Sequence, residues 1–288
     1  MDNLKQPNQI FICNNCRKVD GIFIFDKQTG NEKWDRVEKI NEALHDAYAK
    51  EYSQENKPNI LSDENYLEIR NNVSEILKGT TNPKILDIGC GTGFILRACS
   101  EFSSNLYGVD ISLEMLKRAR DTGATLVKAS AASLPFPDNF FDLVTIHSTL
   151  HHFQEIEPVL KEAYRVLSPG GHLYTDHDPN RSFFRYFNWY IWLRNKRKYG
   201  RRLSKKIYSS SDIGMNEIRL SEYQYLVKHG FSEEQLRPAL LKQGFLNIKI
   251  GFHFPVNPDR FTKALIFLNR IFRKNNFKYY IFSIARKE

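Results

Sequence analysis

The stretch Lys84-Ile-Leu-Asp-Ile-Gly-Cys-Gly-Thr-Gly93 decides the fold of this chain. Apolar residues surround one carboxylate, Asp87, and three glycines then alternate with other residues before a helical pattern resumes at Phe94. This order predicts a buried strand, a tight glycine turn and the start of a helix. Free backbone N–H groups at such a helix start attract electron-rich ligand atoms. The stretch therefore indicates a site for an adenosine-containing cofactor.

The spacing of the glycines distinguishes between cofactors. A dinucleotide fingerprint requires Gly-x-Gly-x-x-Gly, but Phe94 takes the place of its third glycine. The glycines stand instead at Gly89, Gly91 and Gly93, with Asp87 two residues before the first. This arrangement resembles motif I of the class I S-adenosylmethionine-dependent methyltransferases. The resemblance implies that the glycines let the methionine part of the cofactor approach, and that Asp87 orients it.

The second strand extends this resemblance. Residues 106–109 predict a strand that ends at Asp110, about 20 residues beyond the glycines, where a carboxylate can accept two hydrogen bonds from a ribose diol. We therefore expect Asp110, with Ile111 beside it, to bind the ribose. Capping of the next helix, which begins after Ser112, is an alternative role for Asp110.

A third predicted strand, 124–128, leads into a loop that ends in Leu134-Pro135-Phe136. In the family such a loop lies along the adenine, so the resemblance places Ser130 and Ala131 beside that ring. The family commonly has an aspartate where this chain has Ser130, and a hydroxyl accepts a hydrogen bond more weakly than a carboxylate. We expect adenine binding to depend on the backbone around Ala131.

Three histidines follow the fourth predicted strand, 141–146. His147, His151 and His152 belong to a loop beyond the carboxyl end of that strand, where ligands bind in open α/β sheets. Any of them could be a catalytic general base that takes a proton from the methyl acceptor. Alternatively, they anchor the loop through hydrogen bonds to the backbone, because methyl transfer is a direct displacement that many sites catalyse by positioning alone.

The N-terminal segment, residues 1–33, contains a Cys-x-x-Cys pair. Cys13 and Cys16 are expected to form a knuckle between two short strands, 10–12 and 22–25. The segment resembles a zinc ribbon that has lost its second pair of ligands. Because a structural zinc site needs four ligands, we expect no bound metal.

Residues 34–79 are predicted to form a helical cap of two helices. The first, 34–52, has apolar residues spaced by threes and fours. Its last turn resembles the tyrosine-containing helix that folds over the cofactor in many of these enzymes. We expect Tyr52, rather than Tyr48, to contact the cofactor; packing of both rings in the core is the alternative.

Positive charge is concentrated in two stretches of a chain whose net charge is +9. Residues 180–210 hold ten Lys or Arg and no acid, and residues 260–288 hold eight basic residues against one acid. Residues 183–193 are mostly apolar or aromatic, which together with the basic residues after them is typical of a helix lying on an anionic membrane. A lid helix packed on the core is the alternative.

Together these patterns predict an α/β protein with the Rossmann-like, seven-stranded sheet of a class I methyltransferase, helices on both faces and helical lid insertions. We expect a cofactor-binding core at 80–179, a basic aromatic lid at 180–231 and, at 232–288, a closing strand pair with an inserted helix. No apolar run approaches the ~20 residues of a membrane span, and no signal peptide is recognisable. A cytoplasmic protein that can contact a membrane surface is therefore expected.

The expected function is methyl transfer from S-adenosylmethionine to a small lipophilic or aromatic acceptor, at an oxygen, nitrogen or carbon atom left open. An RNA methyltransferase is one alternative, favoured by the basic stretches, but no RNA-binding module is recognisable, so nucleic acid is the less favoured partner. The other alternative is a non-catalytic subunit that keeps the cofactor pocket to stabilise a partner. Two features favour this alternative: Ser130 stands where the family commonly has an aspartate, and the Cys-x-x-Cys pair lacks a second pair of ligands.

Overall fold

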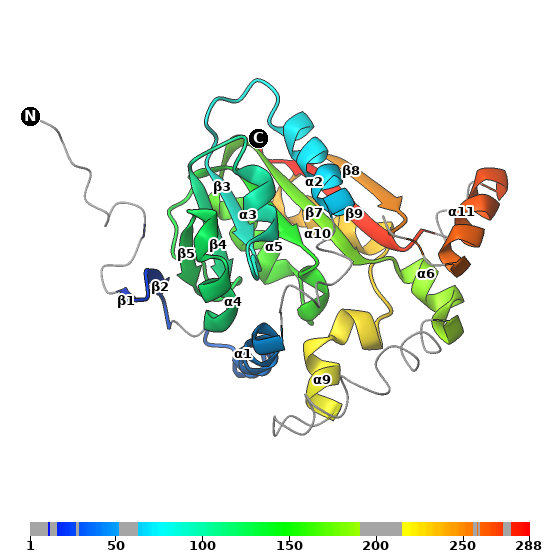
Figure 1. Cartoon of the computed structure of the whole chain (residues 1–288), viewed down its shortest axis with the longest axis horizontal. Helices are drawn as coiled ribbons and strands as arrows, with labels where there is room; N and C mark the ends of the chain where they lie inside the picture. Colours follow the sequence, from blue (N-terminus) through cyan, green and yellow to red (C-terminus); the bar gives the residue numbers. More distant parts are fainter. Residues whose placement is uncertain are drawn as a thin grey trace, which may run out of the picture.

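The computed structural model describes residues 11, 16–26, 29–51, 63–190, 215–255, 258, 260–272 and 278–288. Within these ranges, one sheet carries helices on both faces (Figure 1). Its strands, in chain order, are β1 (Arg17–Val19), β2 (Ile22–Ile24), β3 (Ile85–Ile88), β4 (Leu106–Asp110), β5 (Thr125–Lys128), β6 (Phe141–His147), β7 (Leu167–Pro179), β8 (Leu246–His253) and β9 (Tyr280–Arg286).

The strand order in the sheet is β1-β2-β5-β4-β3-β6-β7-β9-β8. Strands β3 to β7 are parallel, and β9 runs antiparallel to both of its neighbours, β7 and β8. The predicted seven-stranded class I sheet is therefore present as β3 to β9, with its closing antiparallel pair. Because β3 is central, all four of its residues are buried, as expected for a parallel strand covered on both faces.

The N-terminal hairpin differs from the expected knuckle. Its strands are β1 and β2, and they are joined by Asp20-Gly21, both with positive φ (51° and 85°), rather than by the Cys-x-x-Cys pair. Asp-Gly is the preferred sequence of a two-residue turn with this backbone, so the signal was present in the chain. Strand β2 pairs in parallel with β5 and extends the sheet beyond the seven strands. Cys13 lies outside the described residues.

Helices cover the two faces of the sheet and form two cores. One core includes α5 (Glu157–Val166) and α10 (Glu233–Gln243). The other includes α2 (Asp63–Ile76), α3 (Phe94–Cys99) and α4 (Leu113–Arg118). In α5 the buried residues Val159, Leu160, Ala163 and Val166 recur at threes and fours, which is the period that turns one helical stripe toward a sheet.

The remaining helices lie along one edge of this sandwich (Figure 1). They are α1 (Glu32–Glu51), α9 (Met215–Ser221), α6 (Arg181–Tyr186) and α11 (Arg260–Phe272). Helix α1 packs against α4 and α9. Helices α6 and α11 share a third, smaller core that includes Phe183, Leu265 and Tyr279. No helix within the described ranges is both long and apolar enough to cross a membrane.

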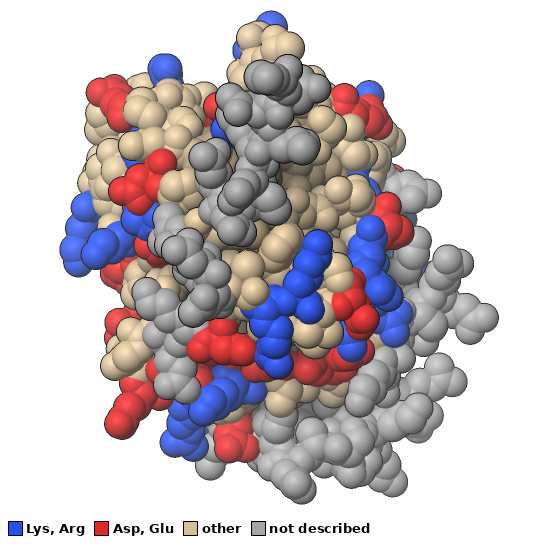
Figure 2. All heavy atoms as spheres, turned by 90° about the vertical axis from the view of Figure 1, so that its left-hand side faces the viewer, with Lys and Arg blue, Asp and Glu red and all other residues tan. Residues whose placement is uncertain are grey.

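The side of the molecule that carries β1, β2 and β5 has charges of both signs. Figure 2 shows Lys and Arg side chains beside Asp and Glu side chains on this side. Elements in this part of the fold carry ion pairs, among them Arg17–Asp26 (3.1 Å), Lys117–Glu114 (2.7 Å) and Lys128–Glu42 (3.0 Å). The described residues of this side therefore do not present charge of one sign to a polyanion.

Candidate functional site

A cavity of about 250 Å³ lies at the carboxyl ends of β3, β4 and β6. The loops after these strands, the loop after β5 and helix α1 supply its walls. This is the edge at which open α/β sheets bind ligands. Of the residues predicted to bind a cofactor or to act in catalysis, those that line the cavity are Asp87, Gly89, Gly91, Asp110, Ile111, Ala131, His147, His151 and His152.

The three glycines of the turn have different surroundings. All have positive φ, but a Cβ atom on Gly91 would meet nothing within 4 Å, whereas one on Gly89 would lie 2.4 Å from the Thr149 side chain. Gly93 does not line the cavity, and its Cβ would lie 2.6 Å from the Thr122 side chain. Gly91 is thus the glycine that leaves space for a ligand. The other two permit close packing within the protein.

Asp87 is a buried carboxylate at the floor of the cavity. It is 1% exposed, and its Oδ1 accepts a hydrogen bond of 2.7 Å from the Thr145 hydroxyl on β6. Burial raises the pKa of Asp87 to about 8; the Thr145 hydrogen bond lowers it, while the Asp110 charge raises it further. A cation bound in the cavity would favour the ionised form of this group.

Asp110 ties the glycine turn to the following helix. Its Oδ2 accepts a hydrogen bond from the Gly91 N–H and its Oδ1 accepts one from the Ser112 N–H, each 2.8 Å long. Ser112 in turn caps α4 by accepting a hydrogen bond from the Met115 N–H. Because a carboxylate has about four acceptor sites, these two backbone bonds leave it able to accept two more. The two roles considered for Asp110, ligand binding and turn support, are therefore compatible.

Ser130 is paired with a carboxylate from helix α1. Its hydroxyl donates a hydrogen bond of 2.5 Å to Glu38 Oε1. Ser130 is 4% exposed and does not line the cavity, whereas Glu38 and Ala131 do. Burial raises the pKa of Glu38, against the lowering effect of the Ser130 hydrogen bond. A carboxylate is therefore present beside Ala131, but it comes from a residue that the sequence reasoning missed.

Helix α1 contributes one polar stripe to the cavity. Glu38, Asn41 and His45 line it and are spaced by three and four residues. Tyr48, one turn further on, does not line the cavity; its ring packs edge-on against His45, with centroids 6.1 Å apart. Tyr52 lies outside the described residues. Within the described residues, helix α1 thus reaches the cavity through Glu38, Asn41 and His45, and the contact expected of Tyr52 stays a prediction.

His147 stands at the cavity wall with its ring against a second histidine. The ring centroids of His147 and His177 are 4.4 Å apart, and His147 Nε2 has no hydrogen-bond partner among the described residues. Burial, followed by the charges of His177 and His253, holds the pKa of His147 well below its usual value. A neutral ring therefore faces the cavity at neutral pH.

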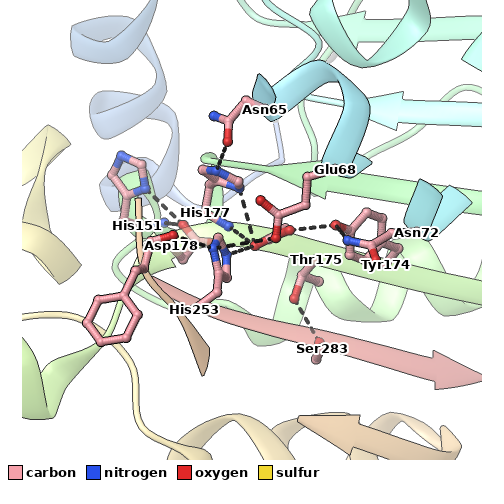
Figure 3. Close-up of polar contacts among 12 residues, drawn as sticks. Asn65, Glu68, Asn72, His151, Tyr174, Thr175, His177, Asp178, His253 and Ser283 are labelled. Atoms are coloured by element: carbon pink, nitrogen blue, oxygen red, sulfur yellow. Dashed lines mark hydrogen bonds and ion pairs between the residues drawn. The ribbon is translucent and has the colours of Figure 1, made fainter. Parts of the chain in front are cut away.

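His151 is paired with a buried carboxylate. Its Nδ1 donates a hydrogen bond of 2.8 Å to Asp178 Oδ1, which also accepts the His151 backbone N–H at 3.1 Å (Figure 3). Burial lowers the pKa of His151, but the Asp178 hydrogen bond and the Glu222 charge outweigh it, so the pKa is raised. With Nδ1 bound to Asp178, Nε2 is the ring atom that can take a proton.

His152 has different electrostatics from its neighbour. Its Nδ1 lies 3.3 Å from the Ser221 carbonyl oxygen and 3.5 Å from Glu222 Oε1. Burial and the charge of His151 hold the pKa of His152 well below its usual value. Its contact with a backbone carbonyl is the loop-anchoring arrangement considered from the sequence. His151 differs in that its ring is hydrogen-bonded to a carboxylate, that of Asp178.

Residues 86–175 match a family model described as a methyltransferase domain. Together with the strand order and the glycine-turn cavity, this match decides the family. This part of the chain is a class I S-adenosylmethionine-dependent methyltransferase domain.

The methyltransferase domain has relatives among curated proteins and solved structures. A demethylmenaquinone methyltransferase of Anoxybacillus flavithermus is 36% identical over 149 residues, which are 48% of this chain and 60% of the relative. One from Listeria welshimeri is 27% identical over 219 residues, 65% of this chain and 90% of the relative. The fold resembles an S-adenosylmethionine-dependent methyltransferase from Mesorhizobium loti, with a TM-score of 0.50, 20% identity and coverage of 78% of this chain and 99% of that one.

The chain spans 60% of the length of the first of these relatives. The fold and the domain family follow from these comparisons.

Most of the site residues predicted from the sequence line the cavity, but several residues beside them were not predicted. These are Glu38, His45 and Asp178. The spacing of Glu38, Asn41 and His45 on one helical face was the signal that could have identified the first two.

Proposed function

We propose that this chain transfers the methyl group of S-adenosylmethionine to a small lipophilic acceptor of the quinol type. The observation that carries the proposal is one cavity that joins the glycine turn and Asp110 to the His151–Asp178 pair. The first set of residues suits an adenosine cofactor, and the second suits removal of a proton from an acceptor.

The residues of the cavity fit S-adenosylmethionine. The space beside Gly91, where a Cβ atom would meet nothing, can receive the methionine part. Asp87 would face its positive charge, Asp110 would accept from the ribose hydroxyls, and Glu38 would accept from the adenine amino group. When bound, the cofactor supplies a methyl group on a sulfonium, which is a very good leaving group.

His151 is proposed as the general base. Asp178 holds the ring through Nδ1 and raises its pKa, which directs proton uptake to Nε2. A proton removed from an acceptor hydroxyl would make the acceptor more electron-rich. His152 would position the loop through its contact with Ser221, and His147 would close the wall behind the acceptor.

The lipophilic acceptor is supported by the relatives and by the surface of the protein. Two relatives are named demethylmenaquinone methyltransferases. Near the α6–α11 core, large hydrophobic side chains stand in water: Trp189 is 60% exposed, Phe267 62% and Ile271 60%. Exposed basic residues, such as Lys263 and Arg270, are next to them on α11. We propose that this surface contacts an anionic membrane from which the acceptor is taken.

The test uses the full chain, methyl-labelled S-adenosylmethionine and anionic vesicles that contain reduced demethylmenaquinone. Label in the quinol is expected, with a loss of at least 100-fold in the turnover of His151→Asn and little change in its cofactor affinity. Parallel reactions contain total RNA or no acceptor. Label in RNA alone would overturn the quinol proposal, and no transfer to any acceptor would favour the non-catalytic alternative.

A flotation assay tests the membrane contact separately. Phe267→Ser/Ile271→Ser should weaken vesicle binding, whereas Leu67→Ser, which removes a 53%-exposed leucine from α2, should not. Equal binding by all three proteins would contradict the proposed surface.

A further inference from the structure

A second polar cluster lies behind the cavity, where the ring of His147 meets His177. Asp176, His177 and His253 place a carboxylate oxygen and two ring nitrogens within 4.8 Å of one another. We propose that these three residues bind a divalent transition-metal ion of the zinc class. Two imidazoles and one carboxylate are a donor set that such ions prefer.

The backbone of β7 is deformed where it presents two of these ligands. Successive side chains of a regular strand point to opposite faces, so neighbours such as Asp176 and His177 would normally point apart. Here the pairing of β7 with β9 shifts register between Thr175 and Asp178, and His177 has a φ of 61°. Such bulges re-aim side chains and cost energy for a residue other than glycine. This bulge brings both side chains to one place.

His177 presents a buried ring nitrogen to the Asp176 carboxylate. Its Nε2 lies 3.2 Å from Asn65 Oδ1 (Figure 3), and its Nδ1 lies 3.3 Å from Asp176 Oδ1. This Nδ1 atom is buried and has no hydrogen-bond partner among the described residues. A metal ion bound between Nδ1 and Oδ1 would give the nitrogen a partner.

The outer contacts of the three ligands are those of a metal site. Metal-binding histidines donate their other ring N–H to an oxygen acceptor. His177 donates to Asn65, and His253 Nδ1 donates to the Phe254 carbonyl oxygen at 3.1 Å. The second oxygen of Asp176 accepts from the Tyr174 hydroxyl at 2.5 Å. Each ligand is therefore oriented by a partner on the atom that faces away from the proposed ion. The ion would replace the hydrogen bond of 2.7 Å between His253 Nε2 and Asp176 Oδ1.

The two distances to Asp176 Oδ1 need only a small adjustment, and the two ring nitrogens lie within 4.8 Å of each other. Tetrahedral ligands at zinc–nitrogen and zinc–oxygen distances stand about 3.3 Å apart. His177 Nδ1 and Asp176 Oδ1 are at 3.3 Å, while His253 Nε2 is 2.7 Å from Asp176 Oδ1 and would move outward. The side chain of His253 is 14% exposed, which gives an ion a way in.

A second cluster with three potential ligands is less suited. It consists of His151, His152 and Glu222. His151 Nδ1 is already held by Asp178, and His152 Nδ1 contacts the Ser221 carbonyl oxygen. A metal between β7 and β8 would instead cross-link two strands and, through Asn65, helix α2. Bound there, it would fix the ring of His177 against the cavity-wall residue His147.

The test is titration of the chelator-treated full chain with Co²⁺, whose visible absorption reports its coordination, followed by displacement with Zn²⁺. One equivalent is expected to bind and to raise the midpoint of thermal unfolding. His177→Asn and His253→Gln should each weaken binding by at least about 100-fold, and Asn65→Ala, which removes only an outer contact, by about 10- to 100-fold. Asparagine is chosen to replace His177 because it tolerates the positive φ of this residue.

Two kinds of control distinguish the proposed site from the other candidates. His172→Asn, on the same strand outside the cluster, and His151→Asn should both bind Co²⁺ as the unmodified chain does. A Cys13→Ser/Cys16→Ser variant should also retain binding. The proposal is overturned if no equivalent binds, if His177→Asn and His253→Gln bind normally, or if only the His151 or cysteine variants lose the ion.

Discussion

Replacing Glu38 by glutamine tests whether helix α1 supplies the adenine acceptor that the loop after β5 lacks. A hydrogen bond to a charged group contributes about 1.5–3 kcal/mol, roughly twice as much as a neutral one. Glutamine keeps an acceptor oxygen near the Ser130 hydroxyl, 2.5 Å from the present Glu38 Oε1, but removes the charge. The expected loss is therefore about half of that energy, or about 3- to 12-fold in the dissociation constant.

Calorimetry of S-adenosylhomocysteine binding measures this loss. The discriminating ligand is S-inosylhomocysteine, which has a carbonyl oxygen in place of the adenine amino group, so this position of the ring cannot donate to Glu38. The unmodified chain should prefer the adenosyl ligand, and Glu38→Gln should lose most of that preference. Glu38→Gln/Ser130→Asp, which places a carboxylate in the loop, should restore it. The control is Glu42→Gln, one turn along α1, which removes the ion pair with Lys128.

Two outcomes would refute the reasoning about Glu38. One is an unchanged affinity of Glu38→Gln for the adenosyl ligand. The other is an equal loss for both ligands, which would mean that Glu38 supports the cavity without contacting the adenine.

Further predictions concern the turn, the buried acid and the base. Gly91→Ala and Gly123→Ala, both at positive φ with open space around the added Cβ, should each destabilise by about 1 kcal/mol in chemical denaturation, but only Gly91→Ala should weaken cofactor binding. Burial raises the pKa of Asp87 to about 8, so this group mostly holds a proton at pH 7. Binding of a cation should therefore release most of one proton and should strengthen as pH rises toward 8. Thr145→Val removes a hydrogen bond that lowers this pKa, so it should move the midpoint of the pH dependence upward. Calorimetry in buffers of different ionisation enthalpy measures the proton release. An unchanged midpoint of the pH dependence in Thr145→Val would contradict the role given to Asp87. Because the pKa of His151 is raised, the rate should fall as pH drops through that pKa, and His151→Asn should abolish this limb of the pH profile.

Local patterns predicted the fold because each element is encoded within a short stretch. The apolar residues around Asp87, the glycines and the acid Asp110 identify a strand, a turn and the next strand without knowledge of distant residues. The closing strand pair expected within residues 232–288 likewise corresponds to β8 and β9, which pair antiparallel. The N-terminal hairpin turns at Asp20-Gly21, whereas the expected turn was at the Cys-x-x-Cys pair.

The chemistry of the site depended on partners that no local pattern reveals. Ser130 and Glu38 are 92 residues apart in sequence, and His151 and Asp178 are 27 apart. Ser130 replaces a carboxylate, and this replacement suggested a non-catalytic role. Glu38 of helix α1 supplies a carboxylate beside Ser130 instead. The bulge at His177 cannot be predicted either, since the run 172–179 gives no glycine or proline at the point where the register shifts.

Calorimetric titration of the full chain with S-adenosylhomocysteine tests the cofactor site most directly. One equivalent is expected to bind to the unmodified chain and to Asp121→Ala, which removes a surface acid paired with Arg97 at 2.6 Å. Asp110→Ala should lose binding, because the ribose acceptor and the hydrogen bond to the Gly91 N–H disappear together. Undiminished affinity in Asp110→Ala, with a normal unfolding midpoint, would contradict the account.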